Sequence, residues 1–205
     1  MEILFDNQAV DLGPFATFPE YAEALERRAQ ERRRVITGVV VDGRNYHGLD
    51  SRELAGRDPA QVARLEISTE NPRKLGITIL YDTARYMPRL ANGFSRVAEQ
   101  IQRREEQSAM ELLQECLSTW MELTQGMKGS MITLGLDLEE VELGETNLGV
   151  IYEEILDLLS DVTDAMEEGD YLDLSDLLEY EVAPRLLSVE EGLYRMINLA
   201  ERKLH

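Results

Sequence analysis

The sequence predicts an α+β protein, with a small α/β domain over residues 1–70 and an antiparallel up-down-up-down four-helix bundle over residues 71–205. Two patterns predict this division. Short apolar and β-branched runs between turn signals, typical of strands, occupy the first third of the chain. From Asn71 onward, apolar residues recur every three or four positions over long segments, as in amphipathic helices. With 205 residues and 43% apolar content, the chain is long enough to bury a core.

The small domain is predicted to contain five strands and one main helix. The main helix is expected to begin at Thr17, which forms a capping-box pair with Glu20, and to continue to about Arg34. Asp42 and Gly43 are a tight-turn signal between the third and fourth strands. The order of these elements resembles a β-grasp domain. The strands are expected at residues 1–5, 8–12, 35–41, 44–47 and 62–68, with a short helix or turn at 51–54.

The first two helices of the predicted bundle have recognisable boundaries. Asn71 can cap the first helix, and Pro88 is expected to kink it because proline removes a backbone donor. The second helix is expected to begin at Ser108, which forms a capping box with Glu111, and to end near Gly135. Their inward residues are expected to be Ile77, Leu80, Ala84, Met87, Ala91, Phe94, Ala98, Ile101, Leu113, Cys116, Trp120, Leu123, Met127, Met131 and Leu134.

The third and fourth helices are separated by a glycine corner. The third is expected over residues 148–168, after which Gly169 can adopt the left-handed conformation that closes helices. Asp170 can cap the fourth helix, which is expected to run from Tyr171 towards Leu204 with a kink near its proline at position 184. Four long helices with short connections favour an up-down-up-down packing.

The formal net charge is −19, and most of it lies in the last third of the chain. Residues 137–205 contain 4 Lys and Arg against 20 Asp and Glu, a net charge of −16, and they open with an acidic connection over residues 137–147. Such a negative field repels phosphate backbones and anionic membrane surfaces, so the sequence predicts neither nucleic-acid nor membrane binding. One basic run, interpreted as the solvated C-terminal end of a helix, consists of Arg27, Arg28, Arg32, Arg33 and Arg34.

Cysteine content and hydropathy predict a cytoplasmic location. Cys116 is the only cysteine, so no disulfide can form within the chain, which favours a reducing compartment. No apolar run approaches the roughly 20 residues that a helix needs to span a bilayer. Met1 is followed directly by Glu2, without the charged and apolar segments of a secretory signal.

Metal and cofactor sites are not predicted. A carboxylate-bridged di-metal site in a bundle needs Glu and His three residues apart on two helices, but the two histidines are His47, in the small domain, and His205, the last residue. A calcium loop beginning at Asp164 would place Met166 and Ser175 at positions that need an oxygen ligand and a glutamate. An ordinary corner between two helices is the preferred interpretation of this segment.

Catalytic residues are not predicted either, and the chain is interpreted as a non-enzyme. Cys116 lies on the apolar stripe between Leu113 and Trp120, where a cysteine usually fills core space. His47 follows Tyr46 in a predicted strand or turn, with no motif around it. No phosphate loop, serine elbow or metalloprotease helix motif is present in the sequence.

The acidic region contains the candidate partner-binding site. Residues 137–181 include 17 Asp and Glu and no Lys or Arg. The carboxylates at the start of the predicted fourth helix form either a solvated face or an anionic docking surface for a basic partner. Tyrosines at both ends of that stretch favour docking, because Tyr is enriched at interface cores. The predicted partner-binding residues are Tyr171, Asp173, Asp176, Glu179 and Tyr180.

Methionines offer a second kind of binding surface. Those at positions 110, 121, 127, 131, 166 and 196 could form an adaptable groove for partner helices. Their helical spacing favours core filling for each of them, and Trp120 is likewise interpreted as an anchor of the bundle core.

A six-residue segment, Asn147-Leu148-Gly149-Val150-Ile151-Tyr152, resembles part of the four-helix flagellar export chaperones of the flagellin-binding type. The predicted β-grasp-like domain is not part of that family's pattern. The resemblance adds secretion and flagellar chaperones to the candidates for a bundle-shaped protein.

The leading interpretation is a non-catalytic, cytoplasmic protein-interaction module, adaptor or chaperone-like, that presents an acidic helical face to a protein partner such as a basic one. A different class of function is a small-ligand sensor or enzyme that uses a cleft between the two domains, with Tyr46, His47 and the first bundle helix. A third is a structural homo-oligomer in which bundles pair through an exposed Leu or Met face.

Overall fold

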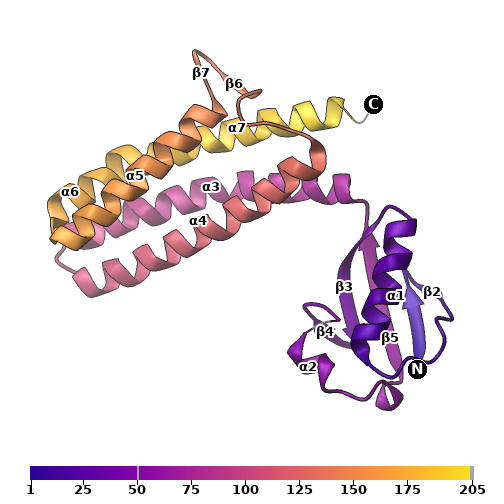
Figure 1. The fold of residues 1–205 in the computed structure, drawn as a ribbon. Coiled ribbons are helices and arrows are strands. Elements are labelled where there is room, and N and C mark those ends of the chain that lie inside the picture. The colour runs from indigo at the N-terminus through magenta and orange to yellow at the C-terminus, as the bar shows by residue number, and fades with distance from the viewer. Residues whose placement is uncertain (50, 204–205) are drawn as a thin grey trace. The chain divides into compact units, whose positions relative to one another are not determined.

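The computed structural model describes residues 1–49 and 51–203. The chain is a mixed α+β protein, mostly helical, with a small N-terminal sheet and a helical C-terminal part (Figure 1). This mixture is the fold class that the sequence predicts. The chain divides into two compact units, Met1–Leu75 and Gly76–His205. None of the helices that the structure describes is long and apolar enough to cross a membrane.

The sheet of the first unit has five strands in the order β2-β1-β5-β3-β4. β1 and β5 are parallel, and the other neighbours are antiparallel. Every strand overlaps a predicted one, although the second strand ends three residues early, at Ala9. The elements are β1 Glu2–Phe5, β2 Gln8–Ala9, β3 Val35–Val41, β4 Arg44–Tyr46, α2 Arg52–Ala55, a 3₁₀ turn at Pro59–Gln61 and β5 Arg64–Glu70.

The main helix of this unit, α1 (Phe18–Glu31), contributes its apolar side to the core of the sheet. It begins as its capping pair predicts, because a carboxylate oxygen of Glu20 accepts hydrogen bonds from the backbone N–H groups of Ala16 at 2.8 Å and Thr17 at 3.2 Å. The core contains Ile3, Phe5, Phe18, Tyr21, Ala22, Leu25, Ala29, Val39, Val41, Leu49, Leu54, Val62, Leu65 and Ile67.

The basic run at the end of α1 is partly packed against the sheet. The guanidinium groups of Arg28 and Arg32 lie over the ring of Phe5, at 5.8 and 5.4 Å from its centroid. Arg33 has a left-handed φ of 53°, so the helix ends three residues before its predicted end. Arg34 then donates hydrogen bonds to β5. The run is therefore the end of a helix, as predicted, but two of its members cover an aromatic ring.

The turn between β3 and β4 also fixes the segment that leads into β5. Asp42 and Gly43 have positive φ angles of 49° and 83°, as the predicted tight turn requires. One carboxylate oxygen of Asp42 accepts hydrogen bonds from the backbone N–H groups of Ala63 at 3.0 Å and Arg64 at 2.9 Å. The other accepts one from the Arg57 guanidinium at 2.8 Å. These contacts, with the Arg64 N–H foremost, hold the pKa of Asp42 below its ordinary value.

The second unit consists of long helices that lie alongside one another (Figure 1). The last three helical elements follow one another without a break, where the sequence predicts one long fourth helix. The predicted extension of that helix to Leu204 lies outside the described residues. The elements are α3 Pro72–Gln102, α4 Glu106–Leu134, β6 Glu142–Leu143, β7 Thr146–Asn147, α5 Leu148–Glu168, α6 Tyr171–Asp176, a π-helical segment Leu177–Val182 and α7 Ala183–Arg202.

Three helix ends have the capping residues that the sequence predicts. The Asn71 side chain accepts a hydrogen bond from the backbone N–H of Arg73 at 2.9 Å, at the start of α3. Gly169 closes α5 with a left-handed φ of 71°. Asp170 then caps α6, because its carboxylate accepts a hydrogen bond from the backbone N–H of Asp173 at 3.1 Å.

The prediction that α4 begins at Ser108 is wrong. Arg104 has a left-handed φ of 63° and closes α3, and α4 begins directly afterwards at Glu106, so Ser108 lies inside the helix. The prediction of a plain connection over residues 137–147 is incomplete, because that connection contains the β6–β7 hairpin, with Gly144 at a φ of 70° in its turn.

The fourth helical run changes its winding next to its proline. The backbone N–H of Ala183 donates a hydrogen bond to the carbonyl of Leu178, five residues back, at the end of the π-helical segment. Pro184 follows and has no N–H to donate. The sequence predicts a kink here, and the structure has π-helical turns, which, like prolines, are places where helices bend.

The core of the helical unit contains the predicted inward residues of α3 and α4. Most of them are buried, and Ile77, Leu123 and Met131 are half-buried against the same core. α5 and α7 contribute further buried residues, namely Leu148, Ile151, Tyr152, Ile155, Val162, Ala165, Ala183, Leu186, Val189, Leu193, Met196, Ile197 and Ala200.

Candidate functional site

The predicted partner-binding residues lie on α6 and on the π-helical segment. Tyr171 and Leu172 open α6, and Asp173 and Asp176 follow on it. All four side chains are exposed, as is that of Tyr180, and the exposed fractions of Leu172 and Tyr180 reach 75% and 61%. We call these five residues the α6 surface. It places apolar and aromatic side chains in solvent beside carboxylates.

Glu179 differs from the other predicted residues because it is tied to α3. Its side chain is half-buried, and a carboxylate oxygen accepts a hydrogen bond from the Gln102 amide at 3.1 Å. The same amide group donates to the hydroxyl of Ser175 at 3.1 Å, and Ser175 is buried between α6 and α3. Glu179 therefore helps to join the π-helical segment to α3, whereas the side chains of the α6 surface are exposed.

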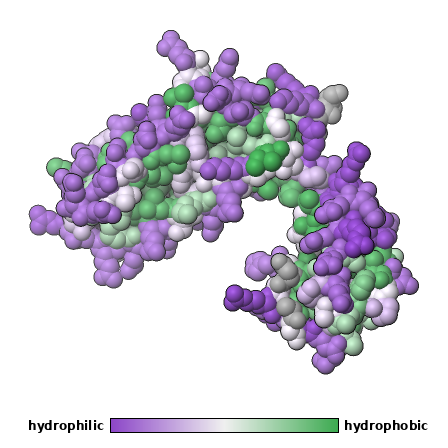
Figure 2. Space-filling view, in the orientation of Figure 1, coloured by the Kyte–Doolittle hydropathy of each residue, from purple (hydrophilic) through white to green (hydrophobic). Residues whose placement is uncertain are grey.

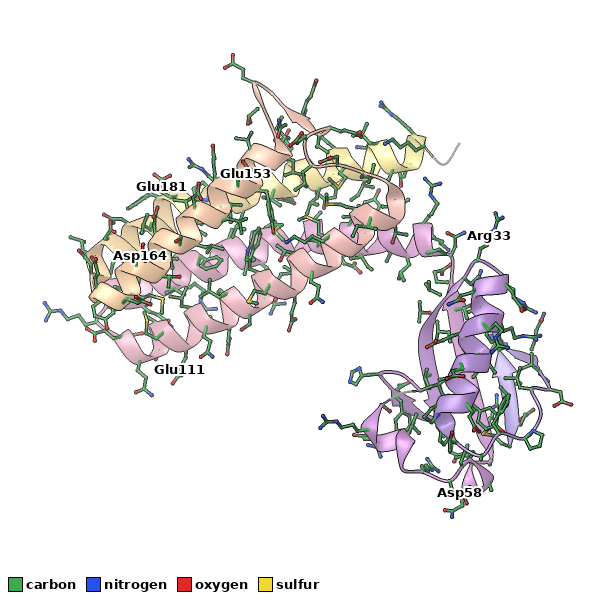
Figure 3. The ribbon with its side chains drawn as sticks, in the orientation of Figure 1. Arg33, Asp58, Glu111, Glu153, Asp164 and Glu181 are labelled. Atoms are coloured by element: carbon green, nitrogen blue, oxygen red, sulfur yellow. The ribbon has the colours of Figure 1, made fainter. Side chains whose placement is uncertain are left out.

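Cations neutralise only part of the acidic region. Arg185 of α7 pairs with Glu154 of α5 at 3.3 Å and with Glu181 at 2.9 Å. Lys203 pairs with Glu140 at 3.3 Å. Within residues 1–49 and 51–203, the carboxylates of α6 have no ion pair. Figure 3 labels four acidic residues of the helical unit: Glu111 on α4, Glu153 and Asp164 on α5, and Glu181 on the π-helical segment.

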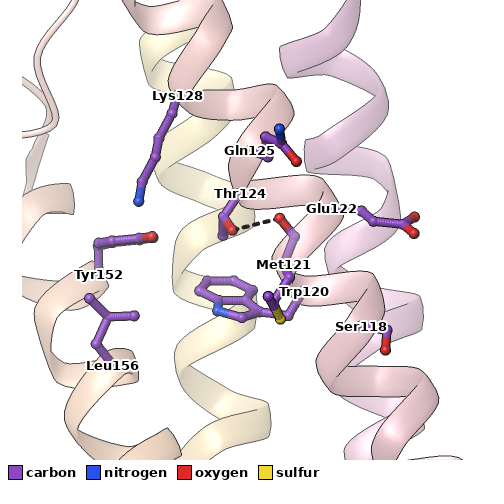
Figure 4. A pocket seen from close by; sticks show the side chains of 9 residues that line it. All are labelled: Ser118, Trp120, Met121, Glu122, Thr124, Gln125, Lys128, Tyr152 and Leu156. Atoms are coloured by element: carbon purple, nitrogen blue, oxygen red, sulfur yellow. Dashed lines mark hydrogen bonds between the residues drawn. The ribbon is translucent and has the colours of Figure 1, made fainter.

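A second feature of the helical unit is an open groove between α4 and α5, with a volume of about 670 Å³ (Figure 4). Its floor contains two buried aromatic rings, Trp120 of α4 and Tyr152 of α5, stacked with centroids 5.9 Å apart at an interplanar angle of 28°. We call this feature the α4–α5 groove. It is lined by Ser118, Trp120, Met121, Glu122, Thr124, Gln125, Lys128, Tyr152 and Leu156.

Two apolar side chains of the α4–α5 groove are in contact with solvent, among polar lining residues. Met121 is 69% exposed and Leu156 is 46% exposed. Lys128 lies at one end, with its ammonium group 5.8 Å from the centroid of the Tyr152 ring. Figure 2 shows hydrophobic residues reaching the surface of the helical unit between hydrophilic ones.

Sequence reasoning missed most of the α4–α5 groove. It placed Trp120 in the core, where the ring is indeed buried, and it favoured core filling for Met121, which is exposed. A signal was present, because Met121 is turned about 100° around the helix from Trp120 and so lies off the stripe that Trp120 shares with Cys116 and Met127. Tyr152 and Leu156, four residues apart on α5, were not singled out although they share a face.

The methionines divide between core and surface. Met127 and Met196 are buried, and Met110 and Met131 are half-buried against the core. Met121 and Met166 are exposed. Of the six methionines, Met121 alone lines the α4–α5 groove.

The residues considered for chemistry lie apart from these surfaces. His47 is exposed and lines a small pocket of about 190 Å³ with Glu26 and strand residues of the first unit. Cys116 is buried in α4, and burial raises the pKa of its thiol. Among residues 1–49 and 51–203, no group of three or more His, Cys, Asp and Glu side chains is arranged to hold a metal ion.

Comparison with known proteins places most of the helical unit in a family. A family model described as a domain of unknown function, DUF8042, matches residues 78–192, which lie in the helical unit and include the α6 surface and the α4–α5 groove. No curated protein and no solved structure has a significant match to the chain.

Proposed function

The chain belongs to the DUF8042 family, and we propose that it is a non-catalytic protein-interaction module, adaptor or chaperone-like, whose α6 surface binds a basic segment of a protein partner. The finer architecture is part of the proposal: a β-grasp-like domain followed by a four-helix bundle that carries the binding surface. We place this activity in the cytoplasm, in keeping with a single cysteine.

The observation that carries the proposal is the composition of the α6 surface. Two tyrosines and a leucine are exposed to solvent beside Asp173 and Asp176, and no Lys or Arg occurs between residues 137 and 181. Exposed aromatic side chains supply contact area at a low cost in conformational entropy, and unpaired carboxylates attract a basic partner and select against an acidic one.

The family match supports the helical unit as the part that carries the function. It covers residues 78–192, from the start of α3 to the middle of α7, and leaves out the N-terminal sheet. The surface that we propose therefore lies within the region that defines the family. The N-terminal unit would then serve a role that differs from binding at α6.

The proposal is tested by affinity capture from a cell extract with quantitative mass spectrometry, using three forms of the chain. The first is the wild type, and the second is Asp173→Lys/Asp176→Lys. The third, Glu153→Lys/Asp164→Lys, is a control that changes the net charge by the same amount on exposed positions of α5. We expect the α6 variant to lose proteins that the wild type and the control retain. Retention of every captured protein by the α6 variant would overturn the proposal.

A further inference from the structure

The α4–α5 groove has a preformed aromatic floor. Trp120 and Tyr152 are buried and stacked, and a hydrogen bond from the Thr124 hydroxyl to the Met121 carbonyl, at 3.0 Å, lies within the same wall (Figure 4). A ligand that entered the groove would meet rings already held in place by two helices. Little ordering of the protein would be needed on binding.

In the part of the chain that the structure describes, the apolar side chains at the edges of the groove have no packing partner on their outer side and remain in contact with solvent. Met121 and Leu156 extend apolar side chains from facing helices into solvent, although each helix has an apolar core face already filled. Methionine adapts its shape to irregular partners, and such residues are common where helices of other proteins dock. The groove is open rather than closed over, which suits a helix of a partner better than a small molecule.

The charge around the groove selects the kind of partner. α4 and α5 together carry eleven carboxylates and a single cation, Lys128. Glu122 lines the groove and Glu115 lies in the adjoining depression, so a second copy docked here would bring like charges towards them, which disfavours self-association. A partner with basic residues along both edges of an apolar stripe has the complementary charge.

The stretch of α4 along the groove sets the length of a helix that could dock there, and the charges at its two ends set the direction of that helix. A shallow depression lined by Glu111 and Glu115 adjoins the groove and shares Ser118 with it. From Glu111 to Lys128 the helix advances about 25 Å, at about 1.5 Å per residue. A docked helix of about 17 residues would match this length. Within the described part of the chain Lys128 forms no ion pair, so it is available for one acidic residue at the end of the partner helix.

We propose that the α4–α5 groove binds one amphipathic helix of a protein partner. Its apolar side chains, spaced three and four residues apart, contact Trp120, Met121 and Leu156. Its Lys and Arg side chains pair with carboxylates such as Glu115 and Glu122, and an acidic residue at one end meets Lys128. This site is separate from the α6 surface and does not depend on it.

The test uses three fluorescently labelled peptides of 18 residues, each designed to be helical and free of Trp. The first has a leucine stripe flanked by Lys, with one Glu at the end that faces Lys128. The second keeps the leucine stripe but replaces Lys with Glu. The third keeps Lys and replaces the leucines with Gln. Anisotropy gives the Kd with the full chain, and the emission of Trp120, the only tryptophan, reports binding at the groove.

Two variants locate the peptide on the protein. Met121→Gln/Leu156→Gln removes the apolar walls at positions that are already exposed, so folding should be retained. Ile132→Gln is the matched control, because Ile132 lies on α4, is 83% exposed and does not line the groove. Asp173→Lys/Asp176→Lys, which disables the α6 surface, should leave binding of the peptide at the groove within about twofold of the wild type.

We expect the first peptide to bind at least tenfold more tightly than the other two and to change the emission of Trp120. The Met121→Gln/Leu156→Gln variant should lose at least tenfold in affinity, and Ile132→Gln should not. If the third peptide, in which Gln replaces the leucines, bound as tightly as the first, charge alone would explain the binding, and the proposal would be overturned. Unchanged binding by the groove variant would also overturn it, as would light scattering that shows a dimer dissociated by this variant.

Discussion

A Cβ atom placed on Gly192 of α7 would lie 2.5 Å from Cδ1, 3.0 Å from Cδ2 and 3.1 Å from Cγ of Leu148, the first residue of α5. Both residues are buried, so the whole leucine side chain would have to move to make room. Gly192 thus allows α5 and α7 to approach closely at this point.

Gly192→Ala should therefore lower the free energy of unfolding by about 1–3 kcal/mol, the usual cost of overpacking a core. Urea denaturation followed by circular dichroism measures this change. Gly129→Ala is the control, because Gly129 lies in α4 with no atom within 4 Å of an added Cβ. That variant should gain up to about 1 kcal/mol from better helix propensity. A stabilising Gly192→Ala would show that the two helices are not packed as described.

A second close approach joins α3 to α4. A Cβ atom on Gly93 would lie 2.8 Å from Sγ of Cys116. Gly93→Ala should lower the free energy of unfolding by about 1–2 kcal/mol, and Cys116→Ala, which removes the sulfur, should relieve that clash. A double-mutant cycle in urea should then give a favourable coupling of about 1 kcal/mol between the two substitutions. Strictly additive effects would contradict the contact.

The thiol of Cys116 should be unreactive in the folded protein. Burial is the main reason that its pKa is raised, and the negative charge of Glu115 adds to this. At pH 8 a thiol reagent should modify native Cys116 on the order of 100-fold more slowly than the same residue in urea. The exposed thiol of a Cys116→Ser/Ser108→Cys variant is the control and should react rapidly in both conditions. Fast modification of native Cys116 would mean that it is accessible.

Asp42 should make the stability of the protein depend on pH in the acid range. Its folded-state pKa lies below the ordinary value of 3.8, because backbone N–H groups and Arg57 favour the carboxylate. A depressed folded pKa gives stability that is complete above about pH 4 to 5 and is lost as the pH falls through the folded value.

Asp42→Asn should thus lower the unfolding midpoint at pH 7, and the difference from the wild type should shrink as the pH falls below about 4. Thermal unfolding between pH 3 and pH 7 measures this. Glu53→Gln, which removes an exposed ion pair with Arg44, should change the free energy of unfolding by less than about 1 kcal/mol. A difference between Asp42→Asn and the wild type that is independent of pH would contradict the described role of the carboxylate.

Salt should stabilise the helical unit. Residues 137–205 carry a net charge of −16, and added ions screen the repulsion among these carboxylates. Raising NaCl from 10 to 500 mM should therefore increase Tm by several degrees, and Asp173→Lys/Asp176→Lys should reduce the increase. A Tm that does not respond to salt would show that the carboxylates are better compensated than their ion pairs indicate.

Local sequence signals predicted several elements well because each depends on neighbouring residues. β3 occupies the β-branched run Val35–Val41 that predicted it, and α5 spans the predicted 148–168. Gly169 and Asp170 close one helix and cap the next through contacts within a few residues. Backbone conformation and capping at these points need no information from distant parts of the chain.

The features that the sequence did not reveal depend on contacts between distant segments. The α4–α5 groove is one such feature, because the stacked rings of its floor, Trp120 and Tyr152, come from two different helices. Glu179 looked like a member of an acidic face, but Gln102, 77 residues away in the chain, binds it. The charge pattern along the chain does not reveal this contact, because Gln102 lies on another helix.

The most direct test of the proposed function is the salt dependence of the Kd for the tightest-bound protein recovered by capture on the wild-type chain. Binding through the α6 surface predicts a Kd that rises steadily between 50 and 300 mM NaCl. It also predicts that Asp173→Lys/Asp176→Lys weakens binding at least tenfold at 50 mM, whereas Glu153→Lys/Asp164→Lys does not. A Kd that is the same at both salt concentrations and in both variants would contradict the account.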